Sequence, residues 1–204
     1  NALVRLAPCS PEPVWIVDQV FHHSVEKSPD GTLWVPGIAT DGFPGNPWLT
    51  EHVRDDSLVR VTLDGKVLEN RSLSKILRKN GLEAELLGRW GFRLNDDPIH
   101  LNQITAAPHD SPYWKKGDLL LSARHLSAVF LYRPSTDAIL WYRSGPWLNQ
   151  HSADFVGSDR IVVLSNNVVS AVPEEYAFPD EAATNRVMFY DFATQTVSEP
   201  FATL

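Results

Sequence analysis

Short runs of apolar residues, separated by turn residues, recur along most of this chain. Three of these runs are 32–35 (TLWV), 119–122 (LLLS) and 160–165 (RIVVLS). Each one follows a turn rich in Gly or Asp, namely Asp30-Gly31, Gly117-Asp118 and Gly157-Ser158-Asp159. Valine, isoleucine, leucine and aromatic residues dominate the runs, which is typical of successive antiparallel β-hairpins. The pattern therefore predicts an all-β protein.

The predicted strands belong to an internal repeat with three units. Each unit opens on a short segment that begins with a histidine: His23, His100 or His151. An apolar strand, a third strand and a returning fourth strand follow in the same order each time. The third and fourth strands are joined by tight turns at Asp64-Gly65, Ser135-Thr136-Asp137 and Ala193-Thr194-Gln195. Four-stranded antiparallel sheets repeated along a chain indicate a β-propeller.

We interpret residues 1–204 as a single, partial β-propeller domain. Residues 13–20 (PVWIVDQV) resemble the fourth strand of the second unit and are predicted to be the outermost strand of a preceding blade. A closed propeller has about four or more blades, so the chain, which does not begin with Met, is expected to be part of a larger ring. Two insertions interrupt the repeat, 36–56 and 72–94. The second has helically spaced apolar residues on both sides of Gly81, which predicts two short helices.

Composition narrows the classes of function. The chain has 204 residues with 43% hydrophobic content, which is ordinary for a globular domain. A net charge of −7 argues against nucleic acid as a partner. No apolar run is long enough to span a membrane. The single Cys9 excludes an internal disulfide and a cysteine metal cage, and no glycine-rich nucleotide-binding loop is present.

Repetition predicts a cluster of histidines. Residues at the same position of successive blades point the same way relative to the propeller axis, so His23, His100 and His151 are expected to meet near one mouth of the central channel. Arg124 follows the second strand of the second unit, and either faces the same mouth or forms a surface salt bridge. Imidazole is both base and nucleophile near neutral pH. Histidines with an arginine therefore suit the transfer of a compact anionic group.

The sequence elements that carry this cluster resemble a known family. HHS with PDGTLWV, HLNQI, LLLSARHLSAVF, ILWYRSGP and QHSADF are similar to arylsulfotransferases over residues 21–166. The resemblance implies a six-bladed propeller that transfers sulfuryl groups from an aryl sulfate to a phenol through a sulfohistidine. It also implies a periplasmic or secreted location. A nucleotide sulfate donor is not expected, because the glycine-rich loop is absent, and no cofactor or metal is expected either.

The resemblance also assigns roles by position. His151 of QH matches the nucleophile that is transiently sulfurylated, His100 of HLN a second active-site histidine, and Arg124 of SAR the active-site arginine. In HHS, His23 is chosen over His22 because it precedes the Ser-Val pair expected to begin the inner strand. His100 and His23, where protonated, and Arg124 would hold the sulfonate oxygens. The general acid–base is expected to be His100 or His23.

Two other functions compete with this interpretation. Three converging histidines are also the ligand set of a catalytic zinc, and a propeller of this kind can be a non-catalytic binding or scaffolding module. Trp147 and Phe155 either offer surfaces to aryl rings or pack in the core, and core packing is favoured. Asp96-Asp97 either orients a histidine ring or forms a turn, and the turn is favoured. The natural donor and acceptor and the oligomeric state are left open.

Overall fold

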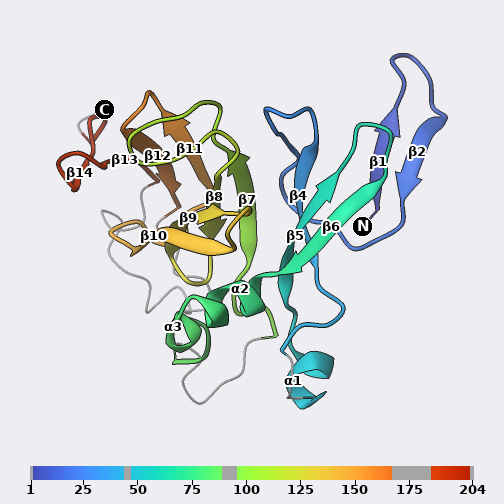
Figure 1. The fold of residues 1–204 in the computed structure, drawn as a ribbon, viewed down its shortest axis with the longest axis horizontal. Helices are drawn as coiled ribbons and strands as arrows, with labels where there is room; N and C mark the ends of the chain where they lie inside the picture. The colour runs from blue at the N-terminus through green and yellow to red at the C-terminus, as the bar shows by residue number, and fades with distance from the viewer. Residues whose placement is uncertain (1, 44–46, 89–95, 167–184, 203–204) are drawn as a thin grey trace, which may run out of the picture.

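The computed structural model describes residues 2–43, 47–88, 96–166 and 185–202. Their regular structure is almost entirely antiparallel β-sheet, in three four-stranded blades and one two-stranded sheet (Figure 1). Within each blade the strands pair in chain order, as a meander. The predicted all-β fold, with propeller blades, is confirmed.

The strands have the following bounds. The two-stranded sheet pairs β1 (Leu3–Leu6) with β2 (Pro13–Val17). The first blade contains β3 (Glu26–Lys27), β4 (Leu33–Ile38), β5 (Asp56–Val61) and β6 (Val67–Ser72). The second contains β7 (Leu101–Ala106), β8 (Leu119–Ala123), β9 (Ala128–Arg133) and β10 (Ala138–Ser144). The third contains β11 (Ser152–Val156), β12 (Arg160–Ser165), β13 (Arg186–Asp191) and β14 (Thr196–Ser198).

Neighbouring sheets pack face to face through three apolar cores. The largest joins the first and second blades, with Trp34 and Leu58 on one side and Ile104 and Phe130 on the other. A second core joins the second and third blades, and a third joins the β1–β2 hairpin to the first blade. Such packing keeps the inner strands side by side, so it also fixes how their ends meet.

The β1–β2 hairpin is held against the turn between β5 and β6. The indole Nε1 of Trp15 donates to the carbonyl of Leu63 at 3.0 Å. Gly65 in this turn has φ +86°, and a Cβ there would lie 2.7 Å from the Trp15 ring. A glycine is therefore required both by the backbone and by the close approach of the ring. The segment 13–20 does contain a strand outside the three complete blades, as predicted.

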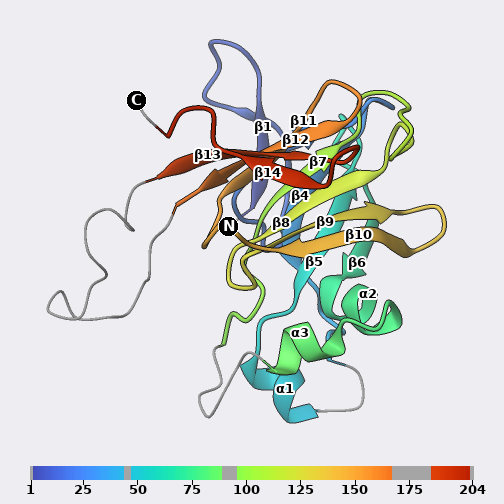
Figure 2. The same ribbon diagram turned by 90° about the vertical axis from the view of Figure 1, so that its left-hand side faces the viewer.

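The three helices of the described residues lie together at one end of the blades, as both ribbon views show (Figure 2). Helices α2 (Leu73–Lys79) and α3 (Glu83–Leu87) lie on either side of Gly81, in agreement with the two predicted helices. Helix α1 (Pro47–His52) was not predicted. Strand β4 continues to Ile38, into the segment assigned to the first insertion. Residues 89–94 of the second insertion lie outside the described residues.

The inner strand of the first blade is shorter than expected. Strand β3 spans only Glu26–Lys27, so the Ser24-Val25 pair does not begin it. The preceding chain nevertheless stays against β4, because the backbone N–H of His22 donates to the carbonyl of Pro36 at 3.0 Å. Within the described residues, no helix has the length and apolarity needed to cross a membrane.

Candidate active site

Three histidines from three blades meet at the beginnings of the inner strands. His100 immediately precedes β7, His151 immediately precedes β11, and His23 lies just before β3. The Nε2 atoms of His23 and His100 are 3.1 Å apart. The ring of His23 lies 4.8 Å from that of His100 and 5.9 Å from that of His151, between centroids. The structure thus brings together residues separated by 77 and 128 positions in the sequence.

His23 and His100 share an uncommon backbone conformation. Their φ angles are +57° and +54°, in the left-handed region that costs a residue other than glycine on the order of 1 kcal/mol or more. The backbone carbonyl of His100 accepts from the N–H of Arg124 at 2.9 Å, which holds it in place. The same strained turn at equivalent positions of two blades directs both imidazoles to one point.

Asp97 orients the imidazole of His100. Its Oδ2 lies 2.5 Å from Nδ1 of His100 and 3.5 Å from Nη1 of Arg54. Burial opposes ionisation of this carboxyl, but the hydrogen bond from His100 and the charge of Arg54 outweigh it and hold the pKa of Asp97 below its usual value. The favoured interpretation of Asp96-Asp97 as only a turn was therefore wrong. An ionised Asp97 accepts a hydrogen bond from the Nδ1–H of His100. The Nε2 atom of His100 then faces His23.

Asp56 ties the first blade to the start of the second. This side chain is fully buried at the beginning of β5. It accepts from the backbone N–H of Leu101 at 2.5 Å and from Nε of Arg54 at 3.0 Å, and Nε2 of His22 lies 3.2 Å away. A buried carboxylate needs partners of this kind. The contacts set the distance between the HHS segment and the first residue of β7.

Arg124 contacts a fourth histidine. Its Nη1 lies 2.9 Å from Nε2 of His125, and Nδ1 of His125 lies 2.5 Å from the backbone carbonyl of Asp97. The rings of His125 and His100 are 4.4 Å apart between centroids. Among the residues that the structure describes, the Arg124 guanidinium therefore meets the histidine cluster through His125, not through a surface carboxylate.

The two residues of the QH element, Gln150 and His151, have different environments and different roles. The buried amide of Gln150 donates to the carbonyls of Ala128 at 2.8 Å and Ala123 at 3.1 Å, at the end of the β8–β9 hairpin. The amide of Asn102 donates in turn to the Gln150 carbonyl at 3.2 Å. His151 itself is exposed. Gln150 thus fixes the third blade against the second and leaves the His151 ring accessible.

His23 is neutral at pH 7. Burial, followed by the neighbouring His100, His22, His151 and Arg54, lowers the pKa of His23 from 6.5 to about 4. This differs from the expectation that a protonated His23 supplies positive charge for the sulfonate oxygens. The guanidinium groups of Arg54, against Asp97, and of Arg124, against His125, are the positive charges that the described residues place beside this cluster.

The depressed pKa of His23 predicts loss of stability in acid. Because the unfolded chain binds the proton near pH 6.5 and the folded chain near pH 4, the free energy of unfolding should fall as pH decreases through this window. We expect His23→Gln to reduce that fall, since glutamine does not titrate. Denaturant unfolding of both proteins at pH 7 and pH 4.5 measures the difference. Equal losses of stability in the two proteins would contradict the assignment.

The two aromatic candidates near His151 are packing residues. Trp147 is buried in the core between the second and third blades. The ring of Phe155 lies 4.8 Å from that of Trp114, which belongs to the same core. Core packing was the favoured interpretation, and these contacts agree with it.

The potential metal ligands that the structure brings together are not the three histidines of the metal-binding alternative. Within the described residues, one group of three potential ligands has its donor atoms within 4.8 Å of one another: Asp97, His100 and His125. This group differs from the three histidines that the alternative invoked. Arg54 contacts Asp97 and Arg124 contacts His125, so two guanidinium charges lie against the group. Two adjacent positive charges oppose the binding of a cation.

The sequence did not reveal every residue of this site. Arg54 and Asp56 lie at the end of the first insertion, outside the repeated segments from which the histidines were predicted. His125 had one available signal, its position directly after the arginine of the SAR element.

Comparison with known proteins agrees with these motifs. The family model described as Arylsulfotransferase (ASST) matches residues 7–204. The chain belongs to the arylsulfotransferase family. No curated protein gives a significant match. A crystal structure of the uncharacterized protein lmo1340 from Listeria monocytogenes EGD-e matches with 11% identity and a TM-score of 0.36, over 92% of this chain and 43% of that one. The chain thus spans less than half the length of that protein.

Proposed function

We propose that this chain transfers a sulfuryl group from an aryl sulfate to a phenol, through a sulfohistidine on His151. The observation that carries the proposal is the meeting of His23, His100 and His151, with Arg124 joined to the cluster through His125. Family membership supports sulfuryl transfer as the chemistry. The exposure of His151 leaves room for the donor, as an attacking nitrogen needs, and His23 is exposed as well. Family membership favours His151 of the two, since His151 stands in the QH element.

The reaction has two displacements at sulfur. In the first, a ring nitrogen of His151 forms a bond to sulfur while the bond from sulfur to the aryl oxygen breaks. In the second, the oxygen of the acceptor phenol attacks sulfur, and the nitrogen–sulfur bond breaks. Sulfuryl transfer resembles phosphoryl transfer in its loose transition state, so positioning and stabilisation of the charged oxygens supply most of the catalysis.

We assign the general acid–base to His100. Its Nδ1–H is held by Asp97, so Nε2 carries or receives the mobile proton on the side facing the cluster. As an imidazolium it donates this proton to the leaving phenolate, and as a neutral ring it takes the proton of the incoming phenol. The negative charge of Asp97 stabilises the imidazolium that is present before the first displacement and that forms again in the second. Neutral His23, 3.1 Å from His100, is a hydrogen-bonding partner of the same nitrogen.

Two arginines supply positive charge for the sulfonate oxygens. Arg124 reaches the cluster from the second blade, and Arg54 lies close enough to His23 to lower its pKa. Guanidinium groups present several fixed donors to an oxyanion. A sulfate ester carries one negative charge, and these two groups are enough to neutralise it. We further propose that the propeller belongs to a larger ring and acts in the periplasm or outside the cell.

The proposal predicts transfer without a nucleotide. Purified protein, incubated with 4-nitrophenyl sulfate and an excess of a second phenol, should release nitrophenol and form one equivalent of the acceptor's sulfate ester. Absorbance follows the first product, and mass spectrometry follows the second. Nitrophenol release without the new ester would indicate hydrolysis and contradict transfer. Binding of phenols without any release would favour the non-catalytic propeller.

A further inference from the structure

We propose that His125 is a positioning residue, held in one neutral tautomer, that aims the guanidinium of Arg124 at the sulfonate group. The inference rests on the proposed function, because it takes Arg124 to bind the transferred group. Two contacts of His125 carry it. Nε2 lies 2.9 Å from Nη1 of Arg124, and Nδ1 lies 2.5 Å from the backbone carbonyl of Asp97.

Of the two hydrogen-bonding partners of the His125 ring, one can only donate and the other can only accept. A guanidinium has donors and no acceptor, so Nε2 of His125 must accept the hydrogen bond from Arg124. A backbone carbonyl has no proton to give, so Nδ1 must carry the hydrogen that reaches Asp97. Only the neutral ring protonated at Nδ1 satisfies both contacts. An imidazolium would place an N–H of its own against the guanidinium of Arg124.

The surroundings of His125 favour the same form. Burial lowers the pKa of His125, and the nearby charge of Arg124 acts in the same direction. The backbone N–H of His125 donates to the carbonyl of Ile99 at 3.0 Å, so its main chain is fixed against the residue before His100. The side chain and the main chain of His125 are therefore both anchored to the segment that carries His100.

This arrangement separates His125 from the histidines that perform chemistry. Both of its ring nitrogens are engaged, so it has neither a lone pair for sulfur nor a proton to exchange. Arg124, in contrast, uses one of its donors on His125 and keeps others for an oxyanion. The hydrogen bonds that link Asp97, His125 and Arg124 thus resemble those of a triad, in which the last member, Arg124, binds the anionic sulfonate of the substrate.

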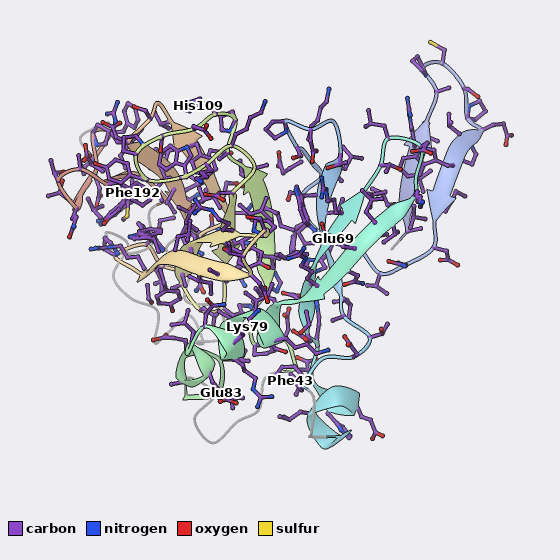
Figure 3. The ribbon with its side chains drawn as sticks, in the orientation of Figure 1. Phe43, Glu69, Lys79, Glu83, His109 and Phe192 are labelled. Atoms are coloured by element: carbon purple, nitrogen blue, oxygen red, sulfur yellow. The ribbon has the colours of Figure 1, made fainter. Side chains whose placement is uncertain are left out.

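A pair of substitutions separates the two contacts. His125→Gln places an amide oxygen near the position of Nε2 and keeps an acceptor for Arg124. His125→Asn places an amide N–H near the position of Nδ1, keeps the contact with Asp97 and loses the acceptor. His109→Asn is a matched control, because its Nδ1 also lies near a backbone carbonyl, at 3.1 Å, but at the far end of β7 (Figure 3).

We expect His125→Asn to lower kcat/KM for 4-nitrophenyl sulfate on the order of 10- to 100-fold, since misplacement of a charge-binding group has costs of this size. His125→Gln should recover most of this loss, within about threefold of the parent protein. In an Arg124→Ala background the two substitutions should become equivalent, because the group that they position is gone. Equal losses for His125→Asn and His125→Gln in the parent background would overturn the inference.

Nitrogen-15 NMR of the labelled histidines tests the tautomer without any turnover. At pH 7, His125 should carry hydrogen on Nδ1 and none on Nε2. A hydrogen on Nε2 would overturn the positioning role. If this tautomer is present, and the Arg124 side-chain signals move in His125→Asn but not in His125→Gln, His125 positions Arg124. Absence of sulfuryl transfer in the same protein would then count against the proposed function alone. Transfer that is equally fast in both variants would leave the proposed function standing and remove the inference.

Discussion

Replacing His151 with alanine should reduce acceptor-dependent release of nitrophenol from 4-nitrophenyl sulfate by about 10⁴-fold or more, as expected for loss of a covalent nucleophile. His23 and His100 would still be present, but Asp97 holds the ring of His100 in the orientation that the proposed proton transfer requires. His151 is exposed, and its backbone N–H pairs with Leu164 at 3.0 Å independently of the side chain. The substitution should therefore leave the fold intact.

The His151→Ala result needs a control for activity and a control for folding. His109→Ala, which removes an exposed histidine at the other end of β7, should retain the activity of the parent protein. Unfolding transitions of both variants should match that of the parent. If His151→Ala keeps activity within about tenfold of the parent, a different nitrogen attacks sulfur, and the assignment of the nucleophile is wrong.

Replacing Asp97 with asparagine should lower kcat by about 10³-fold, because a neutral amide no longer holds the tautomer of His100 or stabilises its imidazolium. KM for the aryl sulfate should change much less, since Asp97 does not touch the substrate in the proposed mechanism. The contact of Asp97 with His125 uses the backbone carbonyl, and the substitution keeps it. Asp97→Asn thus tests the contact of the Asp97 carboxylate with His100. It does not disturb the contacts of His125 that position Arg124.

The neighbouring residue offers a close control for Asp97. The side chain of Asp96 is exposed, and its backbone carbonyl accepts from the N–H of Arg54 at 2.6 Å. Asp96→Asn should therefore leave kcat at the value of the parent protein. Similar kcat values for Asp97→Asn and Asp96→Asn would show that the carboxylate has no part in proton transfer.

The repeat explains how much of this site the sequence could predict. Because propeller blades place equivalent residues around one axis, the meeting of His23, His100 and His151 followed from their shared position before an inner strand. The strands and most of their turns followed from apolar runs and from Gly and Asp residues. These inferences succeeded because the information is local and is repeated three times along the chain.

The rest of the site depends on contacts that have no periodic signal. Arg54 and Asp56 come from an insertion in one blade, and only the folded chain brings Asp56 to the backbone N–H of Leu101. Asp97 stands three positions before His100, and this spacing suits both a turn and a carboxylate that orients the imidazole. The sequence alone therefore could not decide which role Asp97 has. The pKa of His23 depends on four neighbouring groups, and only one of them is adjacent in the sequence.

The most direct test of sulfuryl transfer through His151 is to find the group on that residue. The protein is mixed with 4-nitrophenyl sulfate in the absence of acceptor, quenched in alkali to protect the nitrogen–sulfur bond, and mapped by peptide mass spectrometry. We predict one SO₃ group on the peptide that contains His151, and its disappearance when a phenol is added before the quench. The same group found on His23 or His100, or turnover without any labelled histidine, would contradict the account.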